Sequence, residues 1–379
     1  MSDADVVHDA VERLEWDEAR QGPSPHTKWH QVTRRAALTG GAAGIAALAL
    51  EACGGSSSSS STASAAGGGG GAAGVFGGGG SYKFTMVNHV TTNPFFTPTQ
   101  NGAADACKLL GCSYQWTGSQ SSNVGEMVNS LNSAVSAGVD GIGVSLVDLK
   151  AFNSPVAKAL AAKIPVVAYN ADAASNPRLA YIGQDLFVSG QQMGQHIAAL
   201  VPSGDVALFI ATPGALNIQP RIDGALATLK SHSGITTHVV TTGAALPQEL
   251  STIESYMTAH PNTKGYFAVD GGSTQSIAQG IKKNGLRAKG VKGGGYDLTP
   301  ITQQLLADGQ IDFTIDQQPY LQGFLPILEL YMYKVSQSLT GIANVNTGLK
   351  FLDKTTVVPY NSTKSRYEGT SASAGVAKA

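Results

Sequence analysis

The chain has 379 residues, which is enough for two domains of ordinary size. Its formal net charge is −1 and 13% of its residues are charged, so the composition excludes the strongly basic balance of nucleic-acid-binding proteins and gives no reason to expect an anionic membrane surface as a partner. Three cysteines exclude a disulfide framework, although Cys107 and Cys112 could pair after export or remain two buried thiols.

The first segment of the chain has the features of an export signal. Residues 1–33 are polar, and Arg34 and Arg35 then precede a weakly apolar run over residues 36–50. That run is too short for a membrane span, and a positive front end before a short apolar run is typical of a signal peptide. The arginine pair resembles a twin-arginine signal.

The apolar run ends in Leu50-Glu51-Ala52-Cys53, which resembles the bacterial lipobox, whose cysteine is lipidated. Glu51 departs from that pattern, which has a small neutral residue at its position. We therefore expect an export signal over residues 1–53 and a protein held by a lipid at Cys53, at the outer face of the cell membrane or in the periplasm. Residues 54–81 are mostly Gly, Ser and Ala and bury too little apolar surface to fold, so they predict a flexible tether. A disordered tail is expected over residues 368–379.

From Tyr82 onward, apolar runs that favour strands alternate with helical patterns. The predicted strands of the first half are residues 83–88, 113–117, 141–146, 165–170 and 179–183, and those of the second half are residues 205–211, 237–241, 265–269, 291–296 and 313–315. Predicted helices include residues 123–137, 249–260 and 273–284. This alternation predicts an α/β fold with two doubly wound parallel-sheet lobes of about five strands each, and a ligand between their strand ends.

The first predicted strand is followed by two adjacent aromatic residues. Pro94 suits the first position of the next helix, so Phe95 and Phe96 lie at the carboxyl end of a strand, where open α/β sheets bind ligands. Two adjacent rings do not easily face the same interior, so at least one is expected to face outward, although each ring alone could fill a core. With Asn93 and His89 beside them, an apolar face rimmed by polar groups suits a sugar.

Side chains with planar polar groups follow most of the other predicted strands. They are Ser145, Asp148, Asn170 and Asp172 in the first half, and Asn217, Gln219, Arg221, Asp270, Asp297, Asp316, Gln317 and Gln318 in the second. Each of them alone can be explained as a turn residue or a helix cap. Together they gather on the same side of both sheets, and such a set of carboxylates and amides suits a neutral polyol.

Seven segments also carry a resemblance to a known family. They are Asn93-Pro94-Phe95-Phe96, Gly138-Val139-Asp140-Gly141-Ile142, Ile164-Pro165-Val166-Val167, Arg221-Ile222-Asp223-Gly224, Phe267-Ala268-Val269-Asp270, Gly295-Tyr296-Asp297 and Ile315-Asp316-Gln317-Gln318-Pro319. In this order they resemble the type I periplasmic sugar-binding proteins of ABC importers, the ribose-binding group in particular, over residues 82–367. The resemblance implies a hinge crossed three times, near Gln184, Gln317 and Phe351. The implied lobes are residues 82–184 with 318–350, and residues 185–317 with 351–367.

The resemblance also implies which residues contact the ligand. They are Asn93 with Phe95 or Phe96 from the first lobe, and Gln219, Arg221, Asp270, Asp297 and Gln317 from the second lobe and the hinge. For His89, a ligand contact and a plain turn histidine both remain open. Asn170 and Ala171 stand where ribose binders have an Asp and an Arg. The loss of both charged groups argues against ribose as the ligand, so another pentose, a hexose or an acyclic sugar alcohol is expected.

The function implied is therefore that of a solute-binding component of an ABC transporter. A monosaccharide or sugar alcohol that touches both lobes favours their closure, and the closed protein docks on a membrane permease whose ATPase subunits supply the energy. The protein is expected to be a monomer without cofactor, metal or nucleic-acid partner, and not an enzyme.

Three other functions are possible for a chain of this kind. A lipoprotein enzyme acting on a carbohydrate would need a catalytic motif, and the chain has no His-Glu-x-x-His, Gly-x-Ser-x-Gly or P-loop motif. A transcription regulator of the same fold would carry a DNA-binding segment where this chain has an export signal. A receptor for a nucleoside or a furanosyl signalling molecule would need more aromatic surface, to which Trp116 and Tyr169 could contribute.

Overall fold

The computed structural model describes residues 81–337 and 339–363. Four predictions lie outside these residues: the export signal over residues 1–53, lipidation at Cys53, all of the tether except Ser81, and the tail over residues 368–379. Within the described ranges, no helix combines the length and the apolar character that crossing a bilayer requires.

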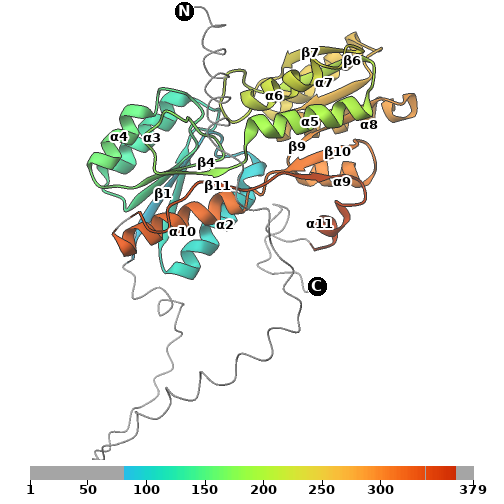
Figure 1. Cartoon of the computed structure of the whole chain (residues 1–379). Coiled ribbons are helices and arrows are strands. Elements are labelled where there is room, and N and C mark those ends of the chain that lie inside the picture. Colours follow the sequence, from blue (N-terminus) through green and yellow to red (C-terminus); the bar gives the residue numbers. More distant parts are fainter. Residues whose placement is uncertain (1–80, 338, 364–379) are drawn as a thin grey trace, which may run out of the picture. The chain divides into compact units, whose positions relative to one another are not determined.

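The first lobe is built on a six-stranded parallel sheet with the order β11-β5-β4-β3-β1-β2 (Figure 1). Its strands are β1 (Lys83–Asn88), β2 (Ser113–Gly118), β3 (Gly141–Val144), β4 (Val166–Tyr169), β5 (Ala180–Gly183) and β11 (Val345–Asn346). Its helices are η2 (Pro94–Phe96), α2 (Thr97–Leu110), α3 (Val124–Ser136), α4 (Asn153–Ala161) and α10 (Leu321–Ser336). Cys107 and Cys112, whose pairing the sequence left open, are free thiols.

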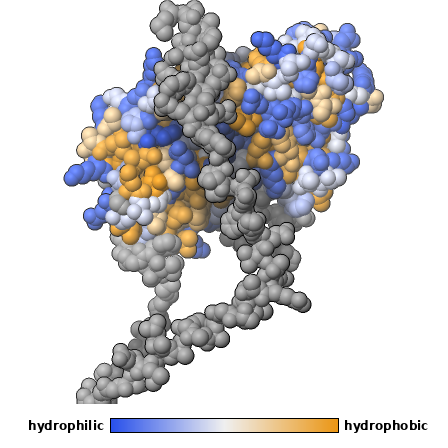
Figure 2. Space-filling view, in the orientation of Figure 1, coloured by the Kyte–Doolittle hydropathy of each residue, from blue (hydrophilic) through white to orange (hydrophobic). Residues whose placement is uncertain are grey.

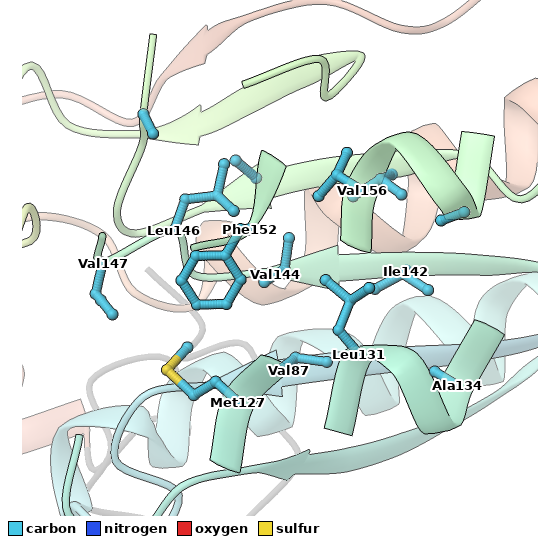
Figure 3. Packing of buried hydrophobic residues seen from close by; sticks show 14 of the residues in the cluster. Val87, Met127, Leu131, Ala134, Ile142, Val144, Leu146, Val147, Phe152 and Val156 are labelled. Carbon is cyan, nitrogen blue, oxygen red and sulfur yellow. The ribbon is translucent and has the colours of Figure 1, made fainter. Parts of the chain in front are cut away.

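Helix α3 shows how the sequence sets these elements. Asn123 caps its first turn by accepting a hydrogen bond from the Glu126 N–H, and Gly138, with a φ of 64°, follows its end. Met127 and Leu131 lie one turn apart on the buried side and pack on strand residues such as Val144 in the core shown in Figure 3. Helix α4 covers the same face of the sheet, while α2 and α10 cover the other.

The second lobe is built on another six-stranded sheet with the order β12-β10-β9-β8-β6-β7. Its strands are β6 (Gly204–Ile210), β7 (Ile235–Thr241), β8 (Gly265–Ala268), β9 (Lys292–Tyr296), β10 (Phe313–Asp316) and β12 (Lys350–Leu352). Its helices are α5 (Leu186–Leu200), α6 (Gln219–Leu229), α7 (Leu246–Ala259), α8 (Gly271–Lys283), η3 (Leu286–Lys289), α9 (Pro300–Ala307) and α11 (Val358–Thr363). The predicted α/β fold of two parallel-sheet lobes is confirmed.

The outermost strand at one edge of each sheet comes from the returning end of the chain. β11 pairs with β5 in the first sheet, and β12 pairs antiparallel with β10 in the second. The sequence analysis did not predict these strands, because two or three residues are too few to show an alternating pattern. The last passage between the lobes is complete by Lys350, which already pairs with Asp316, so it ends one residue before the predicted lobe boundary.

In each lobe, two helices approach closely at glycines. A Cβ atom on Gly323 of α10 would lie 1.8 Å from the Thr99 carbonyl oxygen of α2, and one on Gly102 would lie 2.1 Å from the Tyr320 carbonyl oxygen. In the second lobe, a Cβ atom on Gly190 of α5 or Gly224 of α6 would lie 2.2 Å from a carbonyl oxygen of the facing segment. The helices of both pairs therefore touch backbone to backbone, which a side chain at these positions would prevent.

Candidate functional site

A cavity lies between the lobes, at the carboxyl ends of the central strands. Its empty volume is about 560 Å³, part of which is open solvent. Ten of the predicted site residues line it: His89, Asn93, Phe95, Phe96 and Asn170 from the first lobe, and Asn217, Arg221, Asp270, Asp297 and Gln317 from the second lobe and the hinge. Elements far apart in the sequence are thus brought to one place.

The aromatic pair forms part of the first-lobe wall. Asn93 caps the short helix η2, because its Oδ1 accepts a hydrogen bond of 2.9 Å from the Phe95 N–H, and Pro94 occupies the predicted first position. The rings of Phe95 and Phe96 meet edge to face with centroids 4.7 Å apart. They are 9% and 2% exposed, so the expected outward-facing ring does not face bulk solvent; instead both rings line the cavity.

His89 links the two lobes. Its Nε2 lies 3.1 Å from the Asn217 Nδ2 of the second lobe, and its Nδ1 lies 3.0 Å from Ser145 Oγ. With the Asn217 amide nitrogen as donor, Nε2 accepts and Nδ1 carries the proton, which it donates to Ser145. Burial lowers the pKa of His89 to about 3, with a smaller effect of the Arg221 charge, so the imidazole is neutral.

Further contacts show that the lobes are closed on one another. The Leu216 N–H of the second lobe donates a hydrogen bond of 3.0 Å to the Val147 carbonyl oxygen of the first. The Leu216 side chain packs against the core cluster of the first lobe. Because an open form would lose these contacts, they contribute to the energy difference between open and closed states.

A chain of amides runs from the first lobe through the hinge. Asn170 Nδ2 donates to Gln322 Oε1 at 3.0 Å and to Gln317 Oε1 at 3.4 Å, and Gln317 Nε2 donates to Asp297 Oδ1 at 2.7 Å. Asn170 and Asp297 both have left-handed backbones, with φ of 64° and 73°. Such strained positions concentrate at functional sites, and here they direct both side chains to the cavity wall. Asn170 Oδ1 is buried and makes no hydrogen bond with the described residues.

Charged groups gather on the second-lobe side. Arg221 is 2% exposed, donates to the Val269 carbonyl oxygen at 2.9 Å, and lies 4.1 Å above the Tyr296 ring. Burial raises the pKa of Asp297 to about 7, against the opposing effects of Arg221 and the Gln317 amide. Burial also raises the pKa of Asp270, which caps α8 by accepting from the Ser273 N–H at 2.8 Å. The arginine therefore stabilises the charged forms of two buried carboxyl groups.

One residue of the predicted set, Gln219, is absent from the cavity lining. It is the first residue of α6, and its Oε1 accepts from the Gly214 N–H while its Nε2 donates to Asp223. Residues two apart on a helix point in different directions, and of these two residues it is Arg221 that lines the cavity. Asp148 likewise caps the turn that follows it, and Asp172 pairs with Arg178 outside the cavity.

The sequence analysis missed Glu249, which lines the cavity. It lies in the first turn of α7, where a negative charge is favoured by the helix dipole, but its side chain is buried. Trp116 and Tyr169, considered as extra aromatic surface for a nucleoside, are absent from the cavity lining. Trp116 lies behind Phe96, and the Tyr169 hydroxyl donates to Asn88.

Comparisons with known proteins agree with this fold. A family model described as a periplasmic binding protein domain matches residues 84–336. The xylose/arabinose-binding protein XylF of Sulfolobus acidocaldarius is 50% identical over 306 residues, covering 77% of this chain and 75% of that protein. The ribose import binding protein RbsB of Salmonella typhimurium is 25% identical over 241 residues, covering 62% of this chain and 78% of that protein. A solute binding protein of an ABC transporter from Burkholderia graminis, solved in complex with D-arabinose, has a TM-score of 0.69 and 27% identity, covering 74% of this chain and 97% of that one.

Proposed function

The chain belongs to the periplasmic binding protein domain family, and from this premise we propose that it captures a neutral monosaccharide or sugar alcohol between its lobes for an ABC importer. The observation that carries the proposal is the cavity, to which the first lobe contributes aromatic side chains and both lobes contribute planar polar ones. A sugar presents an apolar CH face and a rim of hydroxyl groups. Phe95 and Phe96 suit the first, and the carboxylate and amide groups suit the second.

Xylose and arabinose are the first ligands to test. The relative that shares half of its aligned residues with this chain is named for these two pentoses, and the Burkholderia protein was solved with D-arabinose. In addition, Asn170 and Ala171 supply a neutral pair where ribose binders carry an acid and a base, which disfavours ribose. A nucleoside receptor is disfavoured because Trp116 and Tyr169 do not line the cavity.

Binding couples to closure in this proposal. A sugar held by both lobes contacts Phe96 and Asn170 on one side and Arg221 and Asp297 on the other, so it stabilises the closed form by contacts that the open form cannot make. The closed protein then docks on a membrane permease, and the ATPase subunits of that importer supply the energy. Hydrophobic residues lie among hydrophilic ones on both lobes of the face seen in Figure 2, which gives a permease apolar surface to contact.

Asp297→Ala tests the proposed site. We expect wild-type protein to gain roughly 5–10 °C in Tm from xylose or arabinose at about a hundredfold excess over Kd. The variant is expected to lose this gain, while its Tm without sugar changes little, because the Asp297 carboxyl caps no helix and its burial already disfavours its charge. Thermal shift over a panel of pentoses, hexoses, their alcohols and adenosine measures both quantities.

Asp308→Ala is the matched control, since Asp308 is an exposed acid of the same lobe that pairs with Lys282 at 3.7 Å. Its sugar response should equal that of the wild type. A collapse of the sugar-free fold in Asp297→Ala would instead identify a structural role. Stabilisation of the wild type by adenosine and by no sugar would overturn the proposed function.

Cys53→Ser tests the proposed anchor. We propose that the protein is exported as a monomer and held at the membrane by a lipid on Cys53, with residues 54–81 as the tether. The variant is expected to leave the membrane fraction and appear in the soluble one, because the cysteine is the only site of acylation in the lipobox-like segment. Cys107→Ser, which alters a thiol of the folded body, should stay in the membrane fraction. A Cys53→Ser protein that remains membrane-bound contradicts the lipid anchor.

A further inference from the structure

We propose that Glu249 is a ligand-contact residue whose protonated carboxyl group donates a hydrogen bond to an oxygen of the bound sugar. The inference rests on the proposed function and adds a donor to a cavity whose other acids act as acceptors. It starts from a side chain that no part of the mechanism above uses. Glu249 lines the cavity, and its side chain is 3% exposed.

No hydrogen bond within the described part of the chain compensates for the burial of the Glu249 carboxyl group. Its Oε2 is buried and makes no hydrogen bond with the described residues. Leaving a buried polar atom without a partner is unfavourable, and native proteins rarely do so. A group in the cavity wall can obtain the missing partner from a molecule bound in the cavity.

Two glycines at the start of α8 make room for this carboxyl group. A Cβ atom on Gly272 would lie 1.9 Å from Glu249 Oε2, and one on Gly271 would lie 2.9 Å from Asp297 Oδ2. Any side chain on Gly272 would therefore occupy the place of the Glu249 carboxyl group. Asp270 already caps this helix end and accepts from Ser273, so the helix does not need a second negative charge there.

The surrounding charges favour the protonated form. The acids that share the cavity wall with Glu249 are Asp270 and Asp297, and the basic groups are Arg221 and the neutral His89. One arginine cannot balance three buried carboxylates. Burial raises the pKa of Glu249 to about 9, and the Asp270 charge adds to the shift, so Glu249 carries a proton at neutral pH. A protonated carboxyl group has one O–H donor.

Calorimetric titration of wild-type protein, Glu249→Gln and Glu249→Ala with xylose and arabinose, from pH 6 to pH 10, tests the inference. At pH 7, Glu249→Gln should bind within about threefold of the wild type, because the amide is a neutral donor of the same shape, whereas Glu249→Ala should bind about tenfold more weakly or worse. Wild-type affinity should fall as the pH rises through about 9, where the donor proton is lost. Glu249→Gln should keep its affinity from pH 8 to pH 10, above the pKa of about 7 of Asp297.

Glu254→Gln is the control, because Glu254 lies on the same helix but pairs with Lys283 at the surface. It should follow the wild type at every pH. Equal affinity of Glu249→Ala and wild type, or equal weakness of Glu249→Gln and Glu249→Ala, overturns the inference while the proposed function stands. If Glu249→Ala does not fold, the comparison of Glu249→Gln with the pH profile of the wild type still tests the inference: a wild-type affinity that does not fall near pH 9 overturns it. Wild-type protein that binds no sugar overturns the function and this inference with it.

Discussion

Replacing Arg221 with methionine is expected to lower the free energy of unfolding by about 3–5 kcal/mol and to abolish sugar binding. The guanidinium group is buried, and its loss leaves the Val269 carbonyl oxygen and Gln184 Oε1 without their donor. It also removes the positive charge that holds down the pKa values of Asp270 and Asp297. Methionine keeps the apolar stem of the side chain but ends where the arginine has its Nε, so the loss reports the guanidinium group with its charge, its hydrogen bonds and its contact with the Tyr296 ring.

The loss in Arg221→Met should depend on pH in a definite direction. Without the arginine, the folded-state pKa values of both aspartates rise further above their unfolded-state values, so the folded protein binds more protons than the unfolded one over a wider range. The free energy of unfolding of the variant then falls as the pH rises. The difference in this free energy between the variant and the wild type should therefore be larger at pH 8 than at pH 5. Urea unfolding at both pH values measures this difference.

Arg178→Met is the matched control, because Arg178 pairs with Asp172 where both side chains are partly exposed. It should cost less than Arg221→Met, because Asp172 keeps some contact with water, and it should leave the sugar response intact. If Arg221→Met unfolds at the same urea concentration as Arg178→Met, the buried charge cluster does not stabilise the second lobe as argued.

Gly323→Ala is expected to destabilise the first lobe by about 3 kcal/mol or more. Its new methyl group would lie 1.8 Å from the Thr99 carbonyl oxygen, so α10 and α2 must move apart and lose the packing between them. Helix propensity alone would favour the substitution, because alanine is the better helix former by about 1 kcal/mol. A lower stability of Gly323→Ala would therefore come from the close approach of α10 and α2. Thermal and urea unfolding provide the measurement.

Gly125→Ala supplies the comparison. Gly125 lies in the first turn of α3, and a Cβ atom there would meet only the Asn123 side chain, at 3.2 Å. This variant should differ from the wild type by less than about 1 kcal/mol, because only the Asn123 side chain has to shift to make room. Equal stability of the two alanine variants would show that α2 and α10 do not need their close approach.

Much of the fold could be predicted because its strands and helices carry strong local signals. The buried strands are apolar runs bounded by turn residues, and α3 and α8 begin at the capping residues Asn123 and Asp270. β11 and β12 could not be predicted, since they are short and become strands only by pairing with β5 and β10. The close approach of α10 and α2 is equally invisible in sequence, because a glycine inside a helix gives no sign of what faces it.

The candidate site was predicted unevenly for a similar reason. Strand ends and the family resemblance located Asn93, Asp297 and Gln317 at the cavity, because topology alone brings these strand ends together. Direction within a helix was harder: Gln219 points away although Arg221, two residues later, points in. The burial of Glu249 was harder still to predict, because an acid in the first turn of a helix is usually exposed. Its side chain is buried here because Gly272 leaves space for it.

The late return of the chain into the first lobe has a consequence for how the protein matures. Strands β1 to β5 are synthesised first, yet the face of their sheet that carries Val167 and Ile182 is covered by Ile327 and Leu330 of α10. A nascent or truncated chain that stops before α10 exposes that apolar face and is prone to aggregate. The lobe that begins translation first therefore waits for α10, which is made only after β6 to β10 of the other lobe, and β12 and α11 then complete that second lobe.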